Sequence, residues 1–432
     1  MINIVIYRYF YNVMCSQHIQ LCNEVNKMEY KVLSSLYYQN RSEYNILSLQ
    51  RKESEFAIKL PFLIGGNTAF FCMCQEIYDT TYKIMKIDKD ILPLRERLPT
   101  AALDQFTKKC LIDEMKLTND IEGVFSTRKE LSEALDNLSQ KSGHKSRFYG
   151  LAQKYSMLSR EYIPLKSCID VRRLYDELVL AEILEEHPEN RPDGTIFRKE
   201  MNEVTTKTGK VIHRGAYPEK QIIELMENAL AVLNDPSLPV LIRISLFHYL
   251  FGYIHPFYDG NGRTSRFISS YLLAQEFDHL IGYGLSYTIK ENKKAYYNAF
   301  EICNDKRNCG DLTPFIITFL NIVYVSFVNL FQALDKRKTA LEQNTDILKK
   351  LNLFSDRDNM LDFCYVLMQG ALFSSDGIPQ KELCAVFNLS TSTIAKRLSE
   401  VEKAGILKKH RDGHSFLYSI DLPNLSSLAE QQ

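Results

Sequence analysis

The chain has 432 residues and carries 53 Lys and Arg against 53 Asp and Glu, so its formal net charge is zero. Hydrophobic residues make up 45% and charged residues 25%, a balance that excludes disordered, collagen-like and strongly basic nucleic-acid-coating proteins. At about 100–200 residues per domain, this length predicts two to four folded domains.

The N-terminal region gives no sign of export or membrane insertion. The stretch Met1–Cys15 lacks a clean apolar segment and a cleavage site, so we do not expect a signal peptide. The chain has no window of 18 or more uncharged apolar residues, so we expect no transmembrane helix. The ten irregularly spaced cysteines are typical of reduced thiols rather than disulfides or structural zinc. We therefore expect a cytoplasmic protein that does not bind membranes.

We interpret residues 1–55 as an N-terminal extension, with translation starting at Met1 or at Met28. Residues 56–160 form an N-terminal region that we expect to be helical. Its first apolar run, Phe56–Ile64, fits either a strand or a loop, and apolar residues then recur at helical spacing from residue 67 to 159. Pro93 and Pro99 are expected to break this pattern.

Residues 161–330 are predicted to form a helical core interrupted by one β-hairpin. The hairpin strands contain the β-favouring residues Val204, Thr205, Val211 and Ile212 on either side of a turn that includes Gly209. Helices are expected at 221–233, 240–254, 261–277, 296–303 and 314–330. The fold class is therefore mainly α with a small β-hairpin.

The C-terminal part begins with a helical linker at 331–358. Residues 359–424 then follow the order helix, helix, turn, helix and β-hairpin, which is the plan of a winged helix-turn-helix domain. The candidate DNA-contacting residues lie on the helix that follows the predicted turn: Thr391, Ser392, Lys396 and Arg397. Winged helices also serve as protein-docking or dimer modules, so DNA, a protein partner and a homodimer all remain open.

The residues from His255 to Arg266 carry the strongest chemical signal. Pro256 ends the preceding helix. Gly260 and Gly262 flank Asn261 and allow backbone N–H groups to approach an anion where the next helix begins. Arg263 and Arg266, three residues apart, project from one face of that helix toward the same place.

Two further side chains in this stretch complete the pattern. Asp259 supplies a hard oxygen ligand of the kind that Mg²⁺ prefers. His255 offers a base whose pKa lies near neutrality. An anion cradle, two cations, a metal ligand and a base within twelve residues indicate chemistry on a phosphate ester.

This stretch resembles in full the signature of the Fic family, His-Pro-Phe-x-(Asp/Glu)-Gly-Asn-Gly-Arg-x-x-Arg. The resemblance extends over about residues 56–325, and the predicted hairpin lies where the family has a flap that docks target proteins. It implies a Fic fold and transfer of AMP from ATP to a Ser, Thr or Tyr hydroxyl of a target protein, or of the chain itself. The residue Gly262 favours AMP over phosphate transfer, because the phosphate-transferring branch carries Lys there.

The resemblance also implies roles for individual residues. His255 would deprotonate the target hydroxyl, and Asp259 would hold Mg²⁺ against the phosphates of ATP. Gly260, Asn261 and Gly262 would cradle the α- and β-phosphates, with Arg263 on the phosphates and Arg266 on the γ-phosphate. Asn304, eight positions after Tyr296, falls where the family has an adenine contact.

A second motif, Thr118-Asn119-Asp120-Ile121-Glu122-Gly123, resembles the inhibitory signature of the same family. Thr118 and Glu122 are four residues apart and therefore share a helix face. The resemblance implies that Glu122 competes with the γ-phosphate for Arg266 and inhibits transfer. Because the motif precedes the core in the same chain, the protein resembles the family class with an N-terminal inhibitory helix.

Two alternatives remain open from the sequence. The chain could be a DNA-binding regulator whose Fic core only senses a nucleotide, although an intact His255 and Asp259 argue against a pure sensor. It could also be bifunctional and remove AMP as well as add it, because in some relatives the inhibitory Glu positions water. The sequence excludes other donors, with cytidine-diphosphocholine or uridylyl groups, less firmly than it excludes phosphate transfer.

Overall fold

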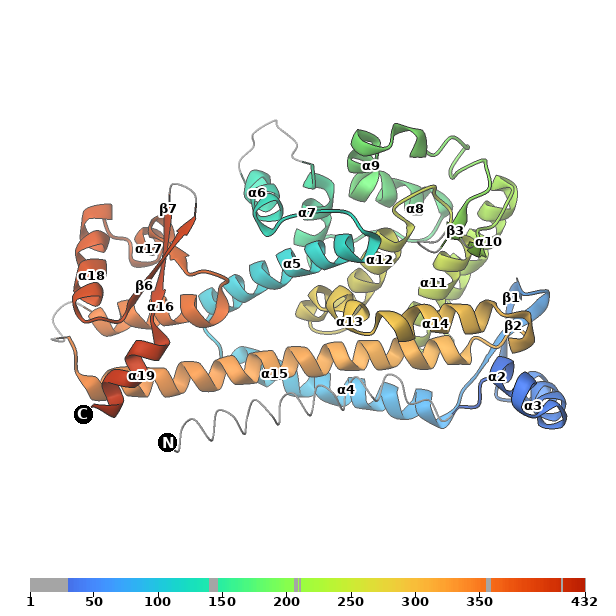
Figure 1. Ribbon diagram of the computed structural model, residues 1–432, viewed down its shortest axis with the longest axis horizontal. Coiled ribbons are helices and arrows are strands. Elements are labelled where there is room, and N and C mark those ends of the chain that lie inside the picture. The colour runs from blue at the N-terminus through green and yellow to red at the C-terminus, as the bar shows by residue number, and fades with distance from the viewer. Residues whose placement is uncertain are drawn as a thin grey trace. The chain divides into compact units, whose positions relative to one another are not determined.

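The computed structural model of the chain describes residues 30–139, 147–205, 209, 211–354, 359–412 and 415–431. The two candidate start residues, Met1 and Met28, therefore lie outside the described residues, as does most of the predicted hairpin turn. The chain divides into two compact units, one made of Met1–Asp88 with Ile112–Val328 and the other of Lys89–Leu111 with Asn329–Gln432. The fold is mainly α-helical with few short strands, as the sequence predicts (Figure 1).

The first unit contains two hairpins and most of the helices. Its elements up to the flap hairpin are α2 (Leu33–Gln39), α3 (Arg41–Glu53), β1 (Ala57–Ile64), β2 (Asn67–Cys72), α4 (Gln75–Glu96) as far as Asp88, α5 (Thr100–Glu122) from Ile112, α6 (Arg128–Ser139), α7 (Tyr149–Ser156), α8 (Cys168–Tyr175), the π-helical turn η1 (Asp176–Leu180), α9 (Ala181–Glu186) and η2 (Pro188–Asn190). The remaining elements are β3 (Glu203–Thr205), β4 (Val211–Arg214), α10 (Glu219–Leu233), α11 (Val240–Ile254), α12 (Asn261–Glu276), η3 (His279–Tyr283), α13 (Leu285–Glu291), α14 (Lys293–Asn304), η4 (Lys306–Asn308) and α15 (Thr313–Leu351) as far as Val328.

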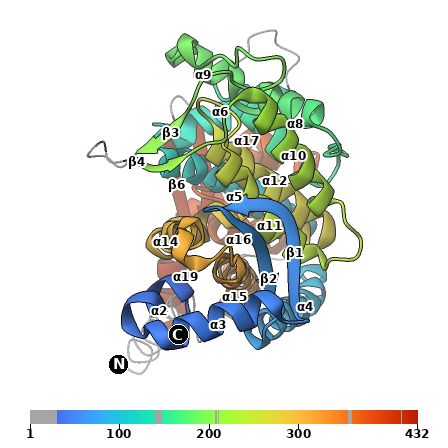
Figure 2. The same cartoon turned by 90° about the vertical axis from the view of Figure 1, so that its right-hand side faces the viewer.

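Helix α11 forms the centre of this unit. Its sequence is apolar on every side, which is typical of a helix surrounded by others. Helices α10 and α12 pack against it, and β1 lies beside α10 (Figure 2). The connection between α11 and α12 is therefore held between well-packed elements, and this connection carries the motif from His255 to Arg266.

The structure corrects the predicted helical pattern at two places. Residues Asn67–Cys72 form strand β2, which pairs antiparallel with β1 from Ala57↔Cys72 to Ile64↔Asn67. The four residues from Ala69 to Cys72 are all buried, so the alternation that marks a half-exposed strand is missing and the spacing looks helical. The other correction concerns Pro93, which lies inside α4 rather than ending it. Pro93 lacks the N–H that would bond the Lys89 carbonyl, so α4 continues to Glu96 with one hydrogen bond fewer.

Helix α15 is the one described helix that is long and apolar enough to cross a membrane by length and composition. An 18-residue window of it has a mean hydropathy of 1.9, but 78% of that window is buried inside the structure. Its apolar side chains, such as Ile316, Leu320 and Val323, are fully buried. These side chains pack against other parts of the protein.

The second unit contains the C-terminal end of α4, the N-terminal half of α5 and α15 from Asn329 onward. It also contains a separate group of short elements. These are α16 (Met360–Phe373), β5 (Ile378–Pro379), α17 (Gln380–Phe387), α18 (Thr391–Lys403), β6 (Leu407–Asp412), β7 (Ser415–Ile420) and α19 (Leu422–Glu430). The three strands form an antiparallel sheet in the order β5-β7-β6. Its fully buried residues include Phe363, Leu383 and Val401 from the helices and Ile406 from the segment before β6.

Candidate active site

The connection from α11 to α12 is a tight loop closed by its own residues. The Asn261 side chain accepts from the Phe257 N–H (3.0 Å) and donates to the Phe257 carbonyl (2.8 Å). Phe257 is fully buried and stacks on Tyr175, with ring centroids 3.6 Å apart. The structure thus uses the Asn261 amide to hold the shape of the loop, while the backbone around it starts α12.

Two residues of this loop have left-handed backbone conformations. His255 has a φ of 53° at the end of α11, and Gly260 has a φ of 76° immediately before α12. Such a φ is uncommon for a residue with a side chain and often marks functional sites. A Cβ atom at Gly260 would also meet Ile183 at 2.9 Å and Val179 at 3.0 Å, so the position requires glycine.

His255 lies in an environment that keeps its imidazole neutral. Burial lowers the pKa of His255 to about 4, helped by His213 and Arg198 and opposed by Glu122. Arg198 is itself fully buried and donates to the backbone carbonyls of His255 (3.0 Å) and Ala216 (2.9 Å). At neutral pH His255 therefore has a free lone pair and can accept a proton.

Arg266 is buried and held by three contacts from α5. Its Nε donates to the Thr118 hydroxyl (2.9 Å), its Nη2 to the Thr118 carbonyl (3.0 Å), and its Nη1 pairs with Glu122 Oε1 (2.7 Å). Burial by itself would raise the pKa of Glu122, but Arg266 outweighs it and the pKa is lowered. The structure thus brings Thr118, Glu122 and Arg266 together across 148 residues of sequence.

The Glu122 carboxylate also lies against the first turn of α12. A methyl group at Gly262 would collide with the Glu122 side chain. Free backbone N–H groups and the helix dipole make the start of a helix favourable for an anion. The carboxylate therefore lies against Gly262 at the start of α12, where the sequence predicts an anion cradle.

Arg263 is paired on a different side. Its Nη1 donates to Glu182 Oε1 at 2.6 Å, and both side chains are almost completely buried. Burial raises the pKa of Glu182, although Arg263 acts in the opposite direction. The two arginines of the motif thus contact carboxylates from two different helices, α9 and α5.

Asp259 stands half-buried at the mouth of the loop, and its Oδ1 accepts from the Gly260 N–H. Within the described ranges, no group of three or more His, Cys, Asp or Glu side chains gathers as a metal cage. Mg²⁺ typically takes one or two protein carboxylates together with substrate phosphates. A single accessible carboxylate beside an anion cradle fits that donor set.

Helix α14 extends the site beyond Arg266. The Tyr296 hydroxyl is 2.7 Å from the Nε2 of the buried His248, and Tyr296 and Tyr297 both lie close enough to Arg266 and Glu122 for electrostatic interaction. Asn304, at the end of the same helix, accepts from the Tyr249 hydroxyl (2.7 Å). Asn304 is therefore fixed by an aromatic neighbour.

The predicted flap is present as β3 and β4, which pair antiparallel from Glu203↔Arg214 to Thr205↔Val211. Val211 and Ile212 are exposed, with Val204 half-buried between exposed neighbours. His213 ties β4 to the end of α11, its Nε2 lying 2.6 Å from the Tyr253 carbonyl. A Cβ atom at Gly215, just after β4, would lie 3.0 Å from the Cβ of His255, so the chain that follows the hairpin passes beside His255.

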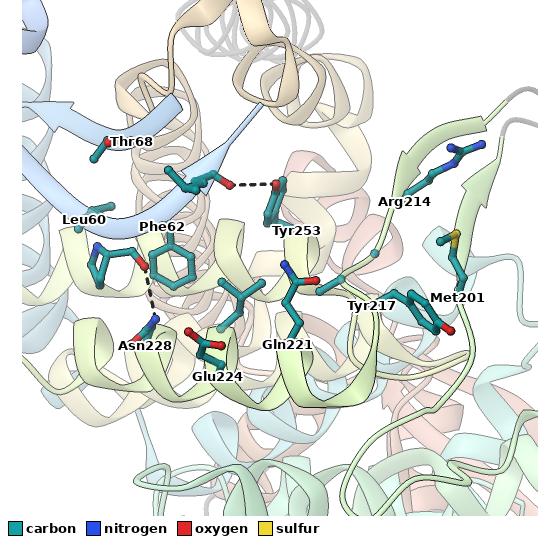
Figure 3. Close-up of a pocket in the computed structure, with 15 residues that line it drawn as sticks. Leu60, Phe62, Thr68, Met201, Arg214, Tyr217, Gln221, Glu224, Asn228 and Tyr253 are labelled. Atoms are coloured by element: carbon teal, nitrogen blue, oxygen red, sulfur yellow. Dashed lines mark hydrogen bonds between the residues drawn. The ribbon is translucent and has the colours of Figure 1, made fainter. Parts of the chain in front are cut away.

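A groove of about 610 Å³ lies beside the flap, between β1, the start of α10 and Tyr253 of α11 (Figure 3). Asn228 and Tyr253 bind the carbonyls of Pro61 and Leu63 on the β1 edge that faces it. The groove lining also includes Gly215. The groove therefore borders the segment after β4, which passes beside His255.

The four candidate DNA-contacting residues lie on α18 in the second unit. Thr391, Ser392 and Lys396 are exposed. Arg397 instead lies over the rings of Phe363 and Phe387, at 5.8 and 5.7 Å, and is half-buried. The structure thus leaves three of the four side chains accessible.

Several residues of the site were missed from the sequence. Glu182, Tyr175 and Arg198 lie far from the motif in sequence and carry no pattern of their own. A buried charged residue can be recognised only once its neighbours are known, because charged residues are mostly exposed.

Residues 169–273 match the model of the Fic/DOC family. The chain is 30% identical over 169 residues to a protein adenylyltransferase Fic of Drosophila mojavensis, covering 38% of this chain and 29% of that relative. It is 26% identical over 153 residues to the protein adenylyltransferase fic-1 of Caenorhabditis elegans, covering 35% of this chain and 28% of that relative. The chain thus aligns with less than a third of the length of each of these curated relatives.

Among solved structures, a Fic family protein from Desulfovibrio desulfuricans aligns with a TM-score of 0.48 and 17% identity, covering 81% of this chain and 97% of that one. The matched segment 169–273 contains α11, the loop and the start of α12, and hence every residue from His255 to Arg266. This chain therefore contains a Fic/DOC family domain.

Proposed function

We propose that the protein transfers AMP from ATP to a hydroxyl side chain of a target protein, and that Glu122 inhibits this reaction. Relatives named protein adenylyltransferase support the reaction class. The observation that carries the proposal is the position of Glu122, 2.7 Å from Arg266 and against Gly262 in the anion cradle. A carboxylate in that place stands in for a phosphate group.

In the proposed reaction the target oxygen attacks the α-phosphorus of ATP, and the bond to pyrophosphate breaks. His255 accepts the hydroxyl proton, for which its neutral imidazole is suited. The backbone N–H groups of the loop and Arg263 stabilise the charge that develops on the phosphate oxygens. Mg²⁺ held by Asp259 and the phosphates would neutralise further negative charge.

The inhibition follows from competition for one place. Three contacts of Arg266 go to Thr118 and Glu122 of α5, so a γ-phosphate would compete with Glu122 for this guanidinium. Lowering the competent fraction to about 1% requires a bias of roughly 2.7 kcal/mol. A pair between the buried Arg266 and the partly exposed Glu122, with a further hydroxyl and carbonyl contact, can supply a bias of that size.

Helix α5 is held in the inhibiting position by several contacts beyond Glu122. The Val124 N–H donates to the Asn119 carbonyl (3.0 Å) and ends the helix directly after Glu122. Lys290 pairs with Asp120 (2.8 Å), and Lys293 donates to the Ile121 carbonyl (3.3 Å). Cations from α13 and α14 therefore stabilise the C-terminal end of α5.

The flap and the adjoining groove are where we place the target polypeptide. The flap would pair with an extended segment by strand addition, a mode that reads backbone more than side chains. The short elements of the second unit, with their three-stranded sheet, we interpret as a winged helix-turn-helix domain. Its partner is either DNA or protein, which a titration with labelled duplex DNA distinguishes.

The experiment uses α-³²P-ATP and Mg²⁺ with wild type, Glu122→Gly, and Glu122→Gly combined with His255→Ala. We expect faint self-labelling of the wild type and at least tenfold more in Glu122→Gly, because the bias on Arg266 is removed. Loss of the base should reduce labelling of the double variant by about 10²–10⁴-fold while ATP binding is kept. Equal labelling of wild type and Glu122→Gly would contradict inhibition by Glu122, and undiminished labelling of the double variant would exclude His255 as the base.

A further inference from the structure

The buried pair between Arg263 and Glu182 has no assigned role in the reaction. The Fic motif includes Arg263 but not Glu182, which lies 81 residues earlier on α9. Their side chains are 1% and 5% exposed, so both charges have been removed from water. Burying two charges is costly unless they are well paired, and a pair of this kind often serves a specific arrangement rather than stability.

The segment that carries Glu182 contacts several residues of the stretch from His255 to Arg266, which we call the phosphate loop. Tyr175 stacks on Phe257, and Val179 and Ile183 lie within contact distance of the position of a Gly260 side chain. The π-helical turn Asp176–Leu180 lies between Tyr175 and these later residues. A π-turn shifts the register of the residues that follow it and is frequent at functional sites. One face of this segment thus meets the loop at its start, middle and end.

The pair itself is joined by a single hydrogen bond. Arg263 Nη1 donates to Glu182 Oε1, while the buried Arg263 Nε and Glu182 Oε2 have no partner among the described residues. A buried donor without an acceptor is unfavourable, and such groups usually meet water or a ligand. Glu182 therefore orients the guanidinium without using all of its donors.

We propose that Glu182 is a positioning residue, which holds Arg263 beside the phosphate loop so that a remaining N–H can bind a nucleotide phosphate. This inference rests on the proposed function, since it concerns how the same site binds ATP. A preoriented donor stabilises the transition state more than a mobile one, because no reorganisation is needed during the reaction. A purely structural pair, in contrast, would matter for folding and not for transfer.

The test compares five variants in the Glu122→Gly background: Glu182→Ala, Glu182→Gln, Arg263→Met, the double variant Glu182→Ala/Arg263→Met, and Glu185→Gln. The last is the control, because Glu185 is an exposed carboxylate on the same helix. For each protein we would measure the rate of AMP transfer against ATP concentration, the affinity for ATP by calorimetry, and the thermal unfolding midpoint.

We expect Glu182→Ala to lower kcat/KM by about 10²-fold, the loss typical of a misplaced binding group. Glu182→Gln should lose less, because its amide oxygen can still accept from Nη1. The double variant should unfold at a higher temperature than Glu182→Ala, since no unpaired buried charge remains. Its transfer rate should nevertheless stay as low as that of Arg263→Met, and Glu185→Gln should match the parent.

Three outcomes would overturn the inference. Glu182→Ala could transfer AMP within about threefold of the parent. The same substitution could cause an equal loss with and without Arg263, which would show that it acts independently of Arg263. The double variant could recover transfer together with stability. If the Glu122→Gly parent transfers no AMP at all, the proposed function fails instead, and unchanged ATP affinity in Glu182→Ala would then refute the positioning role by itself.

Discussion

The stretch from His255 to Arg266 in the first unit and the C-terminal elements of the second unit both carry basic residues. The two sets differ in how far their side chains are buried and paired. Arg263 and Arg266 are each 1% exposed and pair with a carboxylate from another helix. Lys409 pairs with Glu402 at 2.7 Å, yet these side chains are 39% and 55% exposed. Exposed ion pairs contribute about 0–1 kcal/mol, whereas breaking a buried pair leaves an uncompensated charge. Of the two carboxylates, Glu182 is 5% exposed and Glu122 28%, so the Arg263–Glu182 pair is the one of these two that is buried on both sides.

The difference is one of constraint. In the loop each charged group is held by backbone and side-chain contacts from distant segments, so one geometry is selected. On α18 and β6 the charged groups are more exposed: Lys409 pairs with Glu402 at the surface, and Arg397 packs its guanidinium over Phe363 and Phe387. A basic surface of that kind is compatible with DNA, with a protein or with no partner.

The largest stability effect should come from Gly260→Ala. The substitution places a Cβ in a left-handed conformation and within 3.2 Å of Ile183, Val179 and Tyr175. Strain and overpacking together should lower the free energy of unfolding by about 3 kcal/mol. Denaturant unfolding of wild type and variant measures this directly.

Gly66→Ala is the matched control for that prediction. Gly66 has a φ of 81°, close to that of Gly260, but no atom lies within 4 Å of the added Cβ. Its cost should be limited to backbone strain of about 1 kcal/mol. Equal losses for the two substitutions would mean that the support of the loop by α8, η1 and α9 contributes nothing.

The next effect is on the pH dependence of transfer. Burial, with His213 and Arg198, lowers the pKa of His255 to about 4, so the imidazole stays in its basic form as the pH falls from 8 to 5. Glu122 acts in the opposite direction, and its removal should lower this pKa further. The Glu122→Gly enzyme should thus keep most of its kcat/KM at pH 5, where a base with an ordinary pKa near 6.5 would retain about 3%.

A pH–rate profile of AMP transfer, with circular dichroism at each pH as the control for folding, checks this expectation. An acidic limb centred near pH 6.5 in folded enzyme would show that His255 is in contact with water during the reaction, or that another group is the base.

The smallest expected effect concerns Lys396 on the exposed face of α18. If the second unit binds DNA, Lys396→Ala should weaken binding only a few-fold and reduce the salt dependence by about one counterion, because a phosphate contact carries no sequence information. Titration of labelled duplex DNA at two salt concentrations, with and without ATP, measures both quantities. No binding by the wild type at low salt would remove the DNA-binding regulator as an alternative and leave protein docking.

Much of the architecture was predictable because its signals are local. The apolar run Val240–Ile254 and Pro256 predicted where α11 ends, and the flap strands were recognisable by β-favouring residues around a glycine. Strand β2 was not predictable, because its four consecutive buried residues follow no alternation and Phe70 to Cys74 also fits a helix. The continuation of α4 past Pro93 was not predictable either, because a proline usually ends or kinks a helix.

The sequence by itself determined the motif from His255 to Arg266 and the motif from Thr118 to Gly123 that resembles an inhibitory signature, since each is contiguous and its spacing defines which side chains share a face. The family resemblance predicted that Glu122 meets Arg266, whereas only the tertiary structure decided that Glu122 lies against Gly262 and that Glu182 pairs with Arg263. The physical reason is that pairing and burial of a charge depend on segments far apart in the chain. Their approach follows from the packing of the whole core around α11.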